Sequence, residues 1–211
     1  RRWRFVPEPR RQGGMRVDGG DVLGSVQETE SIRHRILTPP LTQGELLELA
    51  PEGDYTIDEV IGRIRLADGN IEKLRMFHRW PVRTPRPFRR RDHAVQPLIT
   101  GQRILDTFYP LLKGGKAAIP GPFGAGKTML QQQIARWCNA EIVIYVGCGE
   151  RGNELTDVLD FMPRLKDPHT GRPLMERTLL VANTSNMTVV AREASIDVGI
   201  TLAEYFRDQG Y

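Results

Sequence analysis

The fold class is decided by residues 121–128, which read Gly-Pro-Phe-Gly-Ala-Gly-Lys-Thr. This run matches the phosphate-loop pattern G-x-x-x-x-G-K-[ST]. The apolar run Lys116–Ile119 before it favours a strand, and the sequence from Gly126 onward favours a helix. In such a loop the glycines let backbone N–H groups turn inward, and the helix N-terminus adds roughly half a positive charge there. The stretch therefore predicts a binding site for the phosphates of a nucleotide.

The predicted loop supplies the residues that we expect to bind phosphate and Mg²⁺. The loop consists of Gly121, Pro122, Phe123, Gly124, Ala125, Gly126, Lys127 and Thr128. Lys127 is expected to reach the β- and γ-phosphates, and Thr128 to offer a hydroxyl ligand to Mg²⁺. The alternative is a glycine-rich turn that only caps a helix, and the strand-then-helix context disfavours it.

A second candidate motif, Gly-Cys-Gly-Glu-Arg-Gly at residues 147–152, follows the predicted strand Glu141–Val146. Ligands of open parallel sheets bind at the carboxyl ends of the strands, where both motifs would lie. Glu150 would orient and polarise a water for in-line attack, and Arg151 would offset charge on the transferring phosphoryl group. The alternative is a Glu–Arg pair on a surface turn.

The remaining pattern from residue 98 alternates strand and helix, which predicts an α/β fold with a RecA-like parallel sheet. Asn153 is expected to cap a helix towards Phe161, Thr178–Ala182 to form a strand, and Gly210 to end the last helix. Two helices are predicted to bury apolar stripes, one made of Leu130, Ile134 and Trp137 and the other of Ile196, Ile200, Ala203 and Phe206.

The first part of the chain predicts a small β-rich, barrel-like domain. Alternating stretches such as Ile32–Leu37 and Tyr55–Ile61 favour strands, and glycines and prolines separate them at short intervals. The predicted organisation is a β-rich domain at 1–78, a connector at 79–97 and the N-terminal part of a nucleotide-binding domain at 98–211.

The connector contains the arginines Arg83, Arg86, Arg89, Arg90 and Arg91 between prolines, which disfavour helix and central strand. Residues 1–100 hold 18 Lys/Arg and 14 Asp/Glu, so they carry the whole net charge of +4. Such a cluster suits a nucleic-acid or acidic partner, but a solvated linker on an assembly surface is favoured because only Phe88 could stack on a base.

Several classes are excluded by composition. No apolar run approaches the roughly 20 residues of a membrane-spanning helix, and no secretory signal is visible. The two cysteines, Cys138 and Cys148, have neither CxxC spacing nor a ligand pattern, which excludes a disulfide scaffold.

Residues 120–154 closely resemble the catalytic A subunits of V-type and archaeal-type rotary ATPases. Those proteins carry a GPFG[SA]GK[ST] loop and a YVGCGERGNE turn, present here at 121–128 and 145–154. Further matches are Gly20–Glu28, His34–Pro40, Trp80–Arg83, Thr100–Asp106, Asn183–Met187, Ala191–Ile196 and Ala203–Asp208. Ala125 stands where eukaryotic members have cysteine, so the loop resembles the prokaryotic kind.

The resemblance implies MgATP hydrolysis or synthesis coupled to H⁺ or Na⁺ transport, with ATP or ADP and Mg²⁺ bound by this protein. It implies partners as well: non-catalytic B subunits in an alternating hexameric ring, stalk subunits and, indirectly, a membrane sector, at the cytoplasmic face of the membrane. Nucleic acid is not expected. The family's magnesium-side Asp is not found, because Thr178–Ala182 runs into Asn183. The sequence thus looks like a partial chain, inactive by itself.

Three alternatives stay open at this stage. A hexameric RecA-like RNA helicase would share the phosphate loop, although residues 1–78 lack a basic and aromatic stacking surface. A non-catalytic nucleotide-binding ring subunit would also share the loop, but Glu150 argues against it. A carrier module is disfavoured because residues 1–72 contain no lysine for attachment.

Overall fold

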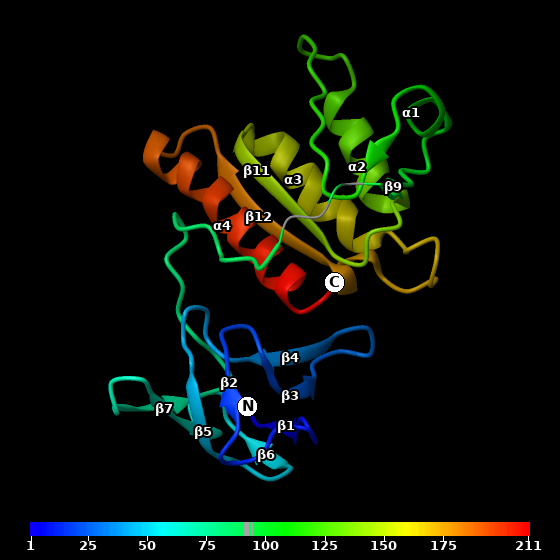
Figure 1. Cartoon of the computed structure of the whole chain (residues 1–211). Coiled ribbons are helices and arrows are strands. Elements are labelled where there is room, and N and C mark those ends of the chain that lie inside the picture. Colours follow the sequence, from blue (N-terminus) through cyan, green and yellow to red (C-terminus); the bar gives the residue numbers. More distant parts are fainter. Residues whose placement is uncertain (91–92, 94) are drawn as a thin grey trace. The chain divides into compact units, whose positions relative to one another are not determined.

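The computed structural model describes residues 1–90, 93 and 95–211, and these fall into two compact units. The first unit comprises Arg1–Pro87 together with Glu204–Tyr211, and the second comprises Phe88–Ala203. Figure 1 labels helices and strands of both units.

The first unit is built from two four-stranded antiparallel sheets, ordered β4-β3-β1-β6 and β2-β5-β7-β8 (Figure 1). Their strands are β1 (Trp3–Pro7), β2 (Arg16–Val17), β3 (Val22–Gln27), β4 (Arg33–Leu37), β5 (Gly44–Leu49), β6 (Gly53–Tyr55), β7 (Gly62–Leu66) and β8 (Ile71–Leu74). Two apolar clusters fill the unit, one with Phe5, Val26, Ile36, Ile61 and Met76, the other with Val17, Leu23, Leu46, Ile64 and Leu74. The predicted β-rich domain is confirmed.

The strand predicted over Tyr55–Ile61 is wrong. The strand β6 ends at Tyr55, and a turn follows in which the Thr56 backbone N–H donates to the Glu59 carboxylate at 2.5 Å. This local bond satisfies the backbone in place of a sheet partner. Ile61 is still fully buried, because the residues after the turn pack into the core.

The last eight residues of the chain pack within the first unit, against β4. Tyr205 Oη lies 2.6 Å from His34 Nε2, and the Arg35 backbone N–H donates to Gln209 Oε1 at 3.2 Å. The Arg33 backbone N–H donates to Tyr211 Oη at 3.0 Å. Gly210 has φ of +91°, as a residue that ends a helix requires.

The expectation that the connector arginines are all solvated is wrong for Arg86, which is only 3% exposed. Its Nε donates to Asp208 Oδ2 at 2.7 Å and its backbone N–H to Glu204 Oε2 at 2.8 Å. Its guanidinium also lies 5.2 Å from the centre of the Tyr205 ring. Acids of the last turn of α4 therefore compensate the buried charge. Arg83, Arg89 and Arg90 are exposed, and Arg91 lies outside the described residues.

His78 shares this cluster with Arg86 and stays neutral in it. Its Nε2 lies 3.0 Å from Arg86 Nη1, so the ring nitrogen accepts the hydrogen bond. Burial, and next the charge of Arg86, lower the pKa of His78 to about 4.

Replacing Arg86 with Ala is expected to destabilise the first unit by about 3–5 kcal/mol, because it removes the buried guanidinium that pairs with Asp208 and leaves that carboxylate to the more exposed Arg207. Denaturant unfolding of the chain measures this change. Arg10, which is exposed, provides the matched control, and Arg10→Ala should change stability by less than about 0.5 kcal/mol. In a double-mutant cycle with Asp208→Ala, a coupling energy near zero would contradict the assignment of the loss to this ion pair.

The second unit contains a parallel pair of strands, β11 (Val143–Glu150) and β12 (Thr178–Thr184). The register is continuous from Val143↔Thr178 to Cys148↔Asn183. Its other elements are β9 (Pro97–Leu98), α1 (Arg103–Phe108), β10 (Leu111–Leu112), α2 (Lys127–Trp137), α3 (Gly152–Phe161), η1 (Met162–Arg164), η2 (Leu174–Arg177) and α4 (Val189–Asp208), whose last turn belongs to the first unit.

Both faces of the parallel pair are covered by helices, as an α/β fold requires. Val143 and Tyr145 point to the cluster that Ala135 of α2 and Val158 of α3 form. On the other face, α4 packs at Gly199, where a Cβ would lie 2.4 Å from Val146 Cγ2. The predicted fold class is confirmed, although no strand forms at Lys116–Ile119, because no neighbouring strand among the described residues pairs with it.

The buried helix faces differ from the predicted ones. Trp137 is 40% exposed and Ala135 is the buried residue of α2, while Ile196 and Ile200 are 45% and 53% exposed. The face of α4 that packs on the sheet carries Ser195 and Gly199, because only small residues allow so close an approach. The predicted cap at Asn153 is also wrong: Arg151 precedes α3, and Asn153 lies in its first turn.

No helix among the described residues is long and apolar enough to cross a lipid bilayer.

Candidate phosphate-binding site

The predicted phosphate loop leads directly into α2. Gly124 and Gly126 have φ of +77° and +80°, a conformation that side-chain-bearing residues rarely adopt. Apart from the adjoining residues, no atom of the described residues lies within 4 Å of where a Cβ would project from either glycine. The loop is therefore open at both positions, so a ligand can approach the backbone closely. This is the arrangement that the glycine spacing predicted.

Lys127 opens α2 and folds back over the loop. Its ammonium group donates to the carbonyl oxygens of Gly121 and Pro122 at 2.5 and 2.6 Å. An ammonium group has three N–H donors, so one remains for a further acceptor. The Lys127 side chain thus holds a positive charge beside the loop backbone, where it can bind the oxygens of a polyphosphate.

The start of α2 contributes its own anion-binding groups. The first N–H groups of a helix have no acceptor inside the helix, and those of Lys127 and Thr128 are among them. The helix has eleven residues, so its dipole places partial positive charge at this end. Thr128 is half-buried in the same turn, and its hydroxyl is the candidate ligand for a cation.

The second predicted motif forms the end of β11 and the turn into α3. The register between β11 and β12 shifts between Cys148 and Glu150, and Gly149 has φ of +72°. The Glu150 carbonyl then accepts the backbone N–H of Ser185 at 2.8 Å. This bulge places Glu150 at the carboxyl end of the strand, where ligands of such sheets bind.

The structure brings the two motifs together through Phe123 and Arg151. The Arg151 guanidinium lies over the Phe123 ring, 4.5 Å from its centre, as a cation–π contact. Phe123 is otherwise 78% exposed at the tip of the loop. The sequence predicted a role for Arg151 towards phosphate, but it did not reveal this contact, because neither residue type singles out the other.

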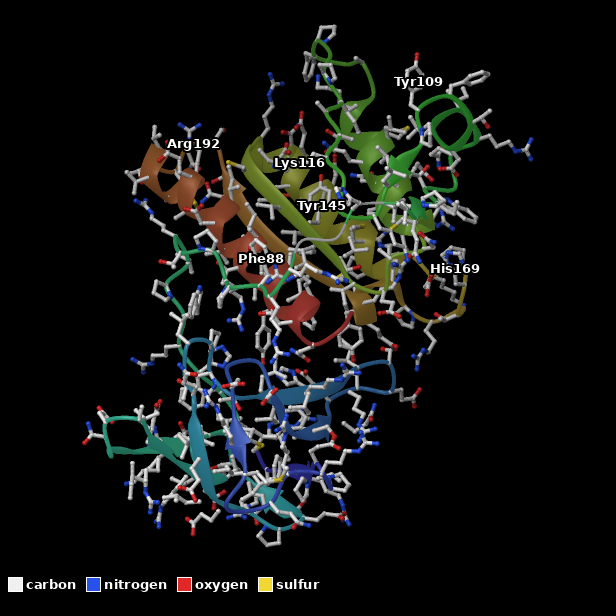
Figure 2. The ribbon with its side chains drawn as sticks, viewed as in Figure 1. Phe88, Tyr109, Lys116, Tyr145, His169 and Arg192 are labelled. Atoms are coloured by element: carbon white, nitrogen blue, oxygen red, sulfur yellow. The ribbon has the colours of Figure 1, made fainter. Side chains whose placement is uncertain are left out.

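Glu150 has a perturbed carboxyl group. Burial raises its pKa, and the hydrogen bond and like charge of Glu154 raise it further. The pKa of Tyr145, on the same strand, is also raised. Burial is the main cause, and the negative charges of Glu150 and Glu154 contribute less. Figure 2 labels Tyr145 among the helices of the second unit. A carboxyl group shifted towards neutral pH suits a proton acceptor, and such groups gather at functional sites.

The sequence alone did not single out Glu154. Replacing this residue is expected to change the pH dependence of the ATP hydrolysis that the sequence predicts. In Glu154→Gln the pKa of Glu150 falls, so the acid limb of the pH–rate profile moves to lower pH and more activity is retained in acid. The matched control is Asp157→Asn, an exposed acid of the same helix. A shift to higher pH, or equal shifts in both variants, would contradict the coupling of Glu150 to Glu154.

Two family models match the chain, one in its first part and one in its second. The model of the ATP synthase alpha/beta family, nucleotide-binding domain, matches residues 101–211, and that of the ATP synthase alpha/beta subunit barrel-sandwich domain matches residues 1–83. Among solved structures, an ATPase from the type III secretion system of pathogenic bacteria aligns with a TM-score of 0.55 at 29% identity, over 71% of this chain and 40% of that one.

Curated relatives match along almost the whole sequence. The chain is 70% identical to the V-type ATP synthase alpha chain of Nitrosococcus oceani, over 99% of this chain and 35% of the relative. It is 61% identical to the A subunit of the A-type ATP synthase of Thermococcus kodakarensis and 55% to that of Sulfolobus acidocaldarius, over 100% of this chain and 36% and 35% of those proteins. The chain thus spans about a third of the length of these relatives.

Proposed function

Because the chain belongs to the ATP synthase alpha/beta family, we propose that it is part of the catalytic subunit of a rotary ATPase or ATP synthase that couples MgATP hydrolysis or synthesis to H⁺ or Na⁺ transport. The observation that carries this proposal is the contact of Arg151 with Phe123, because it joins the phosphate loop to the turn that bears Glu150. A phosphate loop alone supports nucleotide binding, whereas a loop with an adjacent carboxylate supports hydrolysis.

Binding of the triphosphate follows from the loop. The free N–H groups at the start of α2 and the Lys127 ammonium offer donors and positive charge to the phosphate oxygens. The ammonium is held by the carbonyls of Gly121 and Pro122 before a ligand arrives, so little reorganisation accompanies binding.

The residues present fit a magnesium ion only in part, through the half-buried Thr128 hydroxyl. Bound Mg²⁺ would neutralise charge on the β- and γ-phosphates. No cluster of three or more His, Cys, Asp or Glu side chains suited to a metal occurs among the residues whose placement is described. At nucleotide sites Mg²⁺ usually keeps several waters and binds phosphate oxygens together with one or two carboxylates.

Hydrolysis requires a water held in line with the γ-phosphate. Glu150 is the group that accepts a hydrogen bond from this water and polarises it, and its raised pKa makes it a better proton acceptor than an ordinary carboxylate. Arg151 sits in the same turn, and we propose that it leaves the Phe123 ring to offset negative charge as the phosphoryl group transfers.

The partners and location follow from the same proposal. The relatives are named as ATP synthase chains, which supports assembly with other subunits. We propose an alternating ring with non-catalytic B subunits, attached through stalk subunits to a membrane sector, at the cytoplasmic face of the membrane.

The test is MgATP hydrolysis by the full-length protein, alone and assembled with its partner chains. The proposal expects phosphate release by the assembled ring. If the ring forms and binds MgATP but releases no phosphate above the background of the isolated partner chains, the proposal fails.

A further inference from the structure

The beginning of α4 is tied to the turn that carries Glu150. The Cys148 thiol donates to the Arg192 carbonyl at 3.3 Å, and Asn183 Nδ2 donates to the Ala191 carbonyl at 3.2 Å. Both acceptors lie in the first turn of α4, and both donors lie on the last residues of the parallel strands. Figure 2 labels Arg192 on this part of α4.

The Arg192 side chain lies directly against Gly149. A Cβ at position 149 would be 3.1 Å from Arg192 Cδ and 3.3 Å from Nη1. Such distances are shorter than most real Cβ contacts, so a side chain at position 149 would have to displace the arginine slightly. The φ of +72° favours glycine at position 149, and the absence of a side chain lets Arg192 pack directly over it.

The guanidinium of Arg192 is not explained by ion pairing in the part of the chain that the structure describes. Its Nε is buried and has no hydrogen-bond partner there. Buried donors are nearly always paired, and an unpaired one reduces stability. Stability alone therefore gives no reason for an arginine at this position, whereas support of the bulge at Gly149 does.

We propose that Arg192 is a positioning residue for Glu150. By filling the space over Gly149, it holds the bulge between Cys148 and Glu150 and so fixes the direction of the carboxylate. This inference rests on the function proposed above, because it concerns the residue assigned to the water. A displacement of about 1 Å at a catalytic group can lower a rate by about a hundredfold.

The test compares variants of the full-length protein assembled with its partners. Arg192→Ala should lower kcat by about tenfold or more, with the KM for ATP within about threefold of native, because phosphate binding is left intact. Arg192→Lys keeps the methylenes over Gly149 and should restore kcat to within about threefold of native. The matched control is Glu193→Ala, an exposed residue of the same turn, which should be native-like.

A second readout reports on the turn without using activity. Cys148 is exposed, and its thiol donates a hydrogen bond to the backbone carbonyl of Arg192. Cys138 is buried in the same unit. Peptide-level alkylation of the full-length protein should show Cys148 reacting at least about fivefold faster in Arg192→Ala, with Cys138 unchanged, because the turn opens locally.

The proposal is overturned if Arg192→Ala keeps native kcat, or if the Ala and Lys variants lose activity equally together with a lowered Tm and faster alkylation of Cys138. The latter result would mean a general structural role. The function proposed above is judged separately by Glu150→Gln: an active Glu150→Gln variant removes that function, whereas an inactive one beside a native-like Arg192→Ala removes only this inference.

Discussion

Replacing Glu150 with Gln is expected to abolish ATP turnover by the full-length protein in its assembly. Loss of a positioned proton acceptor lowers a rate by about 10²–10⁴-fold, and Gln at this position cannot accept the proton. Nucleotide affinity should stay within about threefold of native, because the phosphate loop and Lys127 are unchanged. Steady-state phosphate release and equilibrium nucleotide binding measure the two effects.

The same substitution provides its own control for folding. Glu150 and Glu154 repel each other when both are ionised, and Gln removes one of the two charges. The Tm of Glu150→Gln should therefore equal or exceed that of the native protein. Native turnover in a variant with that Tm would remove Glu150 from the proposed role.

Replacing Lys127 with Ala is expected to weaken MgATP binding by about a hundredfold. Charge-assisted hydrogen bonds contribute about 1.5–3 kcal/mol each, and a hundredfold in Kd corresponds to about 2.7 kcal/mol. The variant also frees the carbonyls of Gly121 and Pro122, so the loop loses its internal brace. Titration calorimetry on the full-length protein measures the change.

Lys116 is the matched control, since it is an exposed lysine just before the loop. Lys116→Ala should bind MgATP within about twofold of native. Equal losses in the Lys116 and Lys127 variants would indicate a diffuse effect of charge, and would contradict a specific phosphate contact at Lys127.

The phosphate loop could be predicted from sequence because its requirements are local. The φ values of Gly124 and Gly126 and the helix that starts at Lys127 depend on neighbouring residues alone. The bulge at Gly149 was not predicted: the strand expected over Glu141–Val146 runs instead from Val143 to Glu150, and its register shifts between Cys148 and Glu150. In the loop, the spacing of residue types encodes the geometry.

The packing faces could not be predicted in this way, because they depend on the surface that covers them. Apolar spacing favoured Ile196 and Ile200 as the buried face of α4, but the close approach at Gly199 decides which face meets Val146. The burial of Arg86 could not be predicted for the same reason. A run of arginines suggests exposure to solvent, and the partner that compensates the buried charge, Asp208, lies 122 positions away in the sequence.

The interactions around Glu150 were partly hidden for a similar reason. Its four-residue spacing from Glu154 is visible in the sequence, yet a coupled pair requires the turn and α3 to bring both side chains together. Arg192 gives no local signal, since only the packing of α4 on the strand ends places it at Gly149.

The most direct test of the central claim, that one chain supplies both the phosphate loop and the carboxylate for hydrolysis, is a single-turnover experiment. The full-length protein in its assembly is mixed with less than one equivalent of radiolabelled MgATP, quenched in acid, and analysed for ATP and ADP. We predict that native protein converts its bound ATP to ADP, whereas Glu150→Gln retains bound ATP uncleaved. Conversion at the same rate in both proteins would contradict the account.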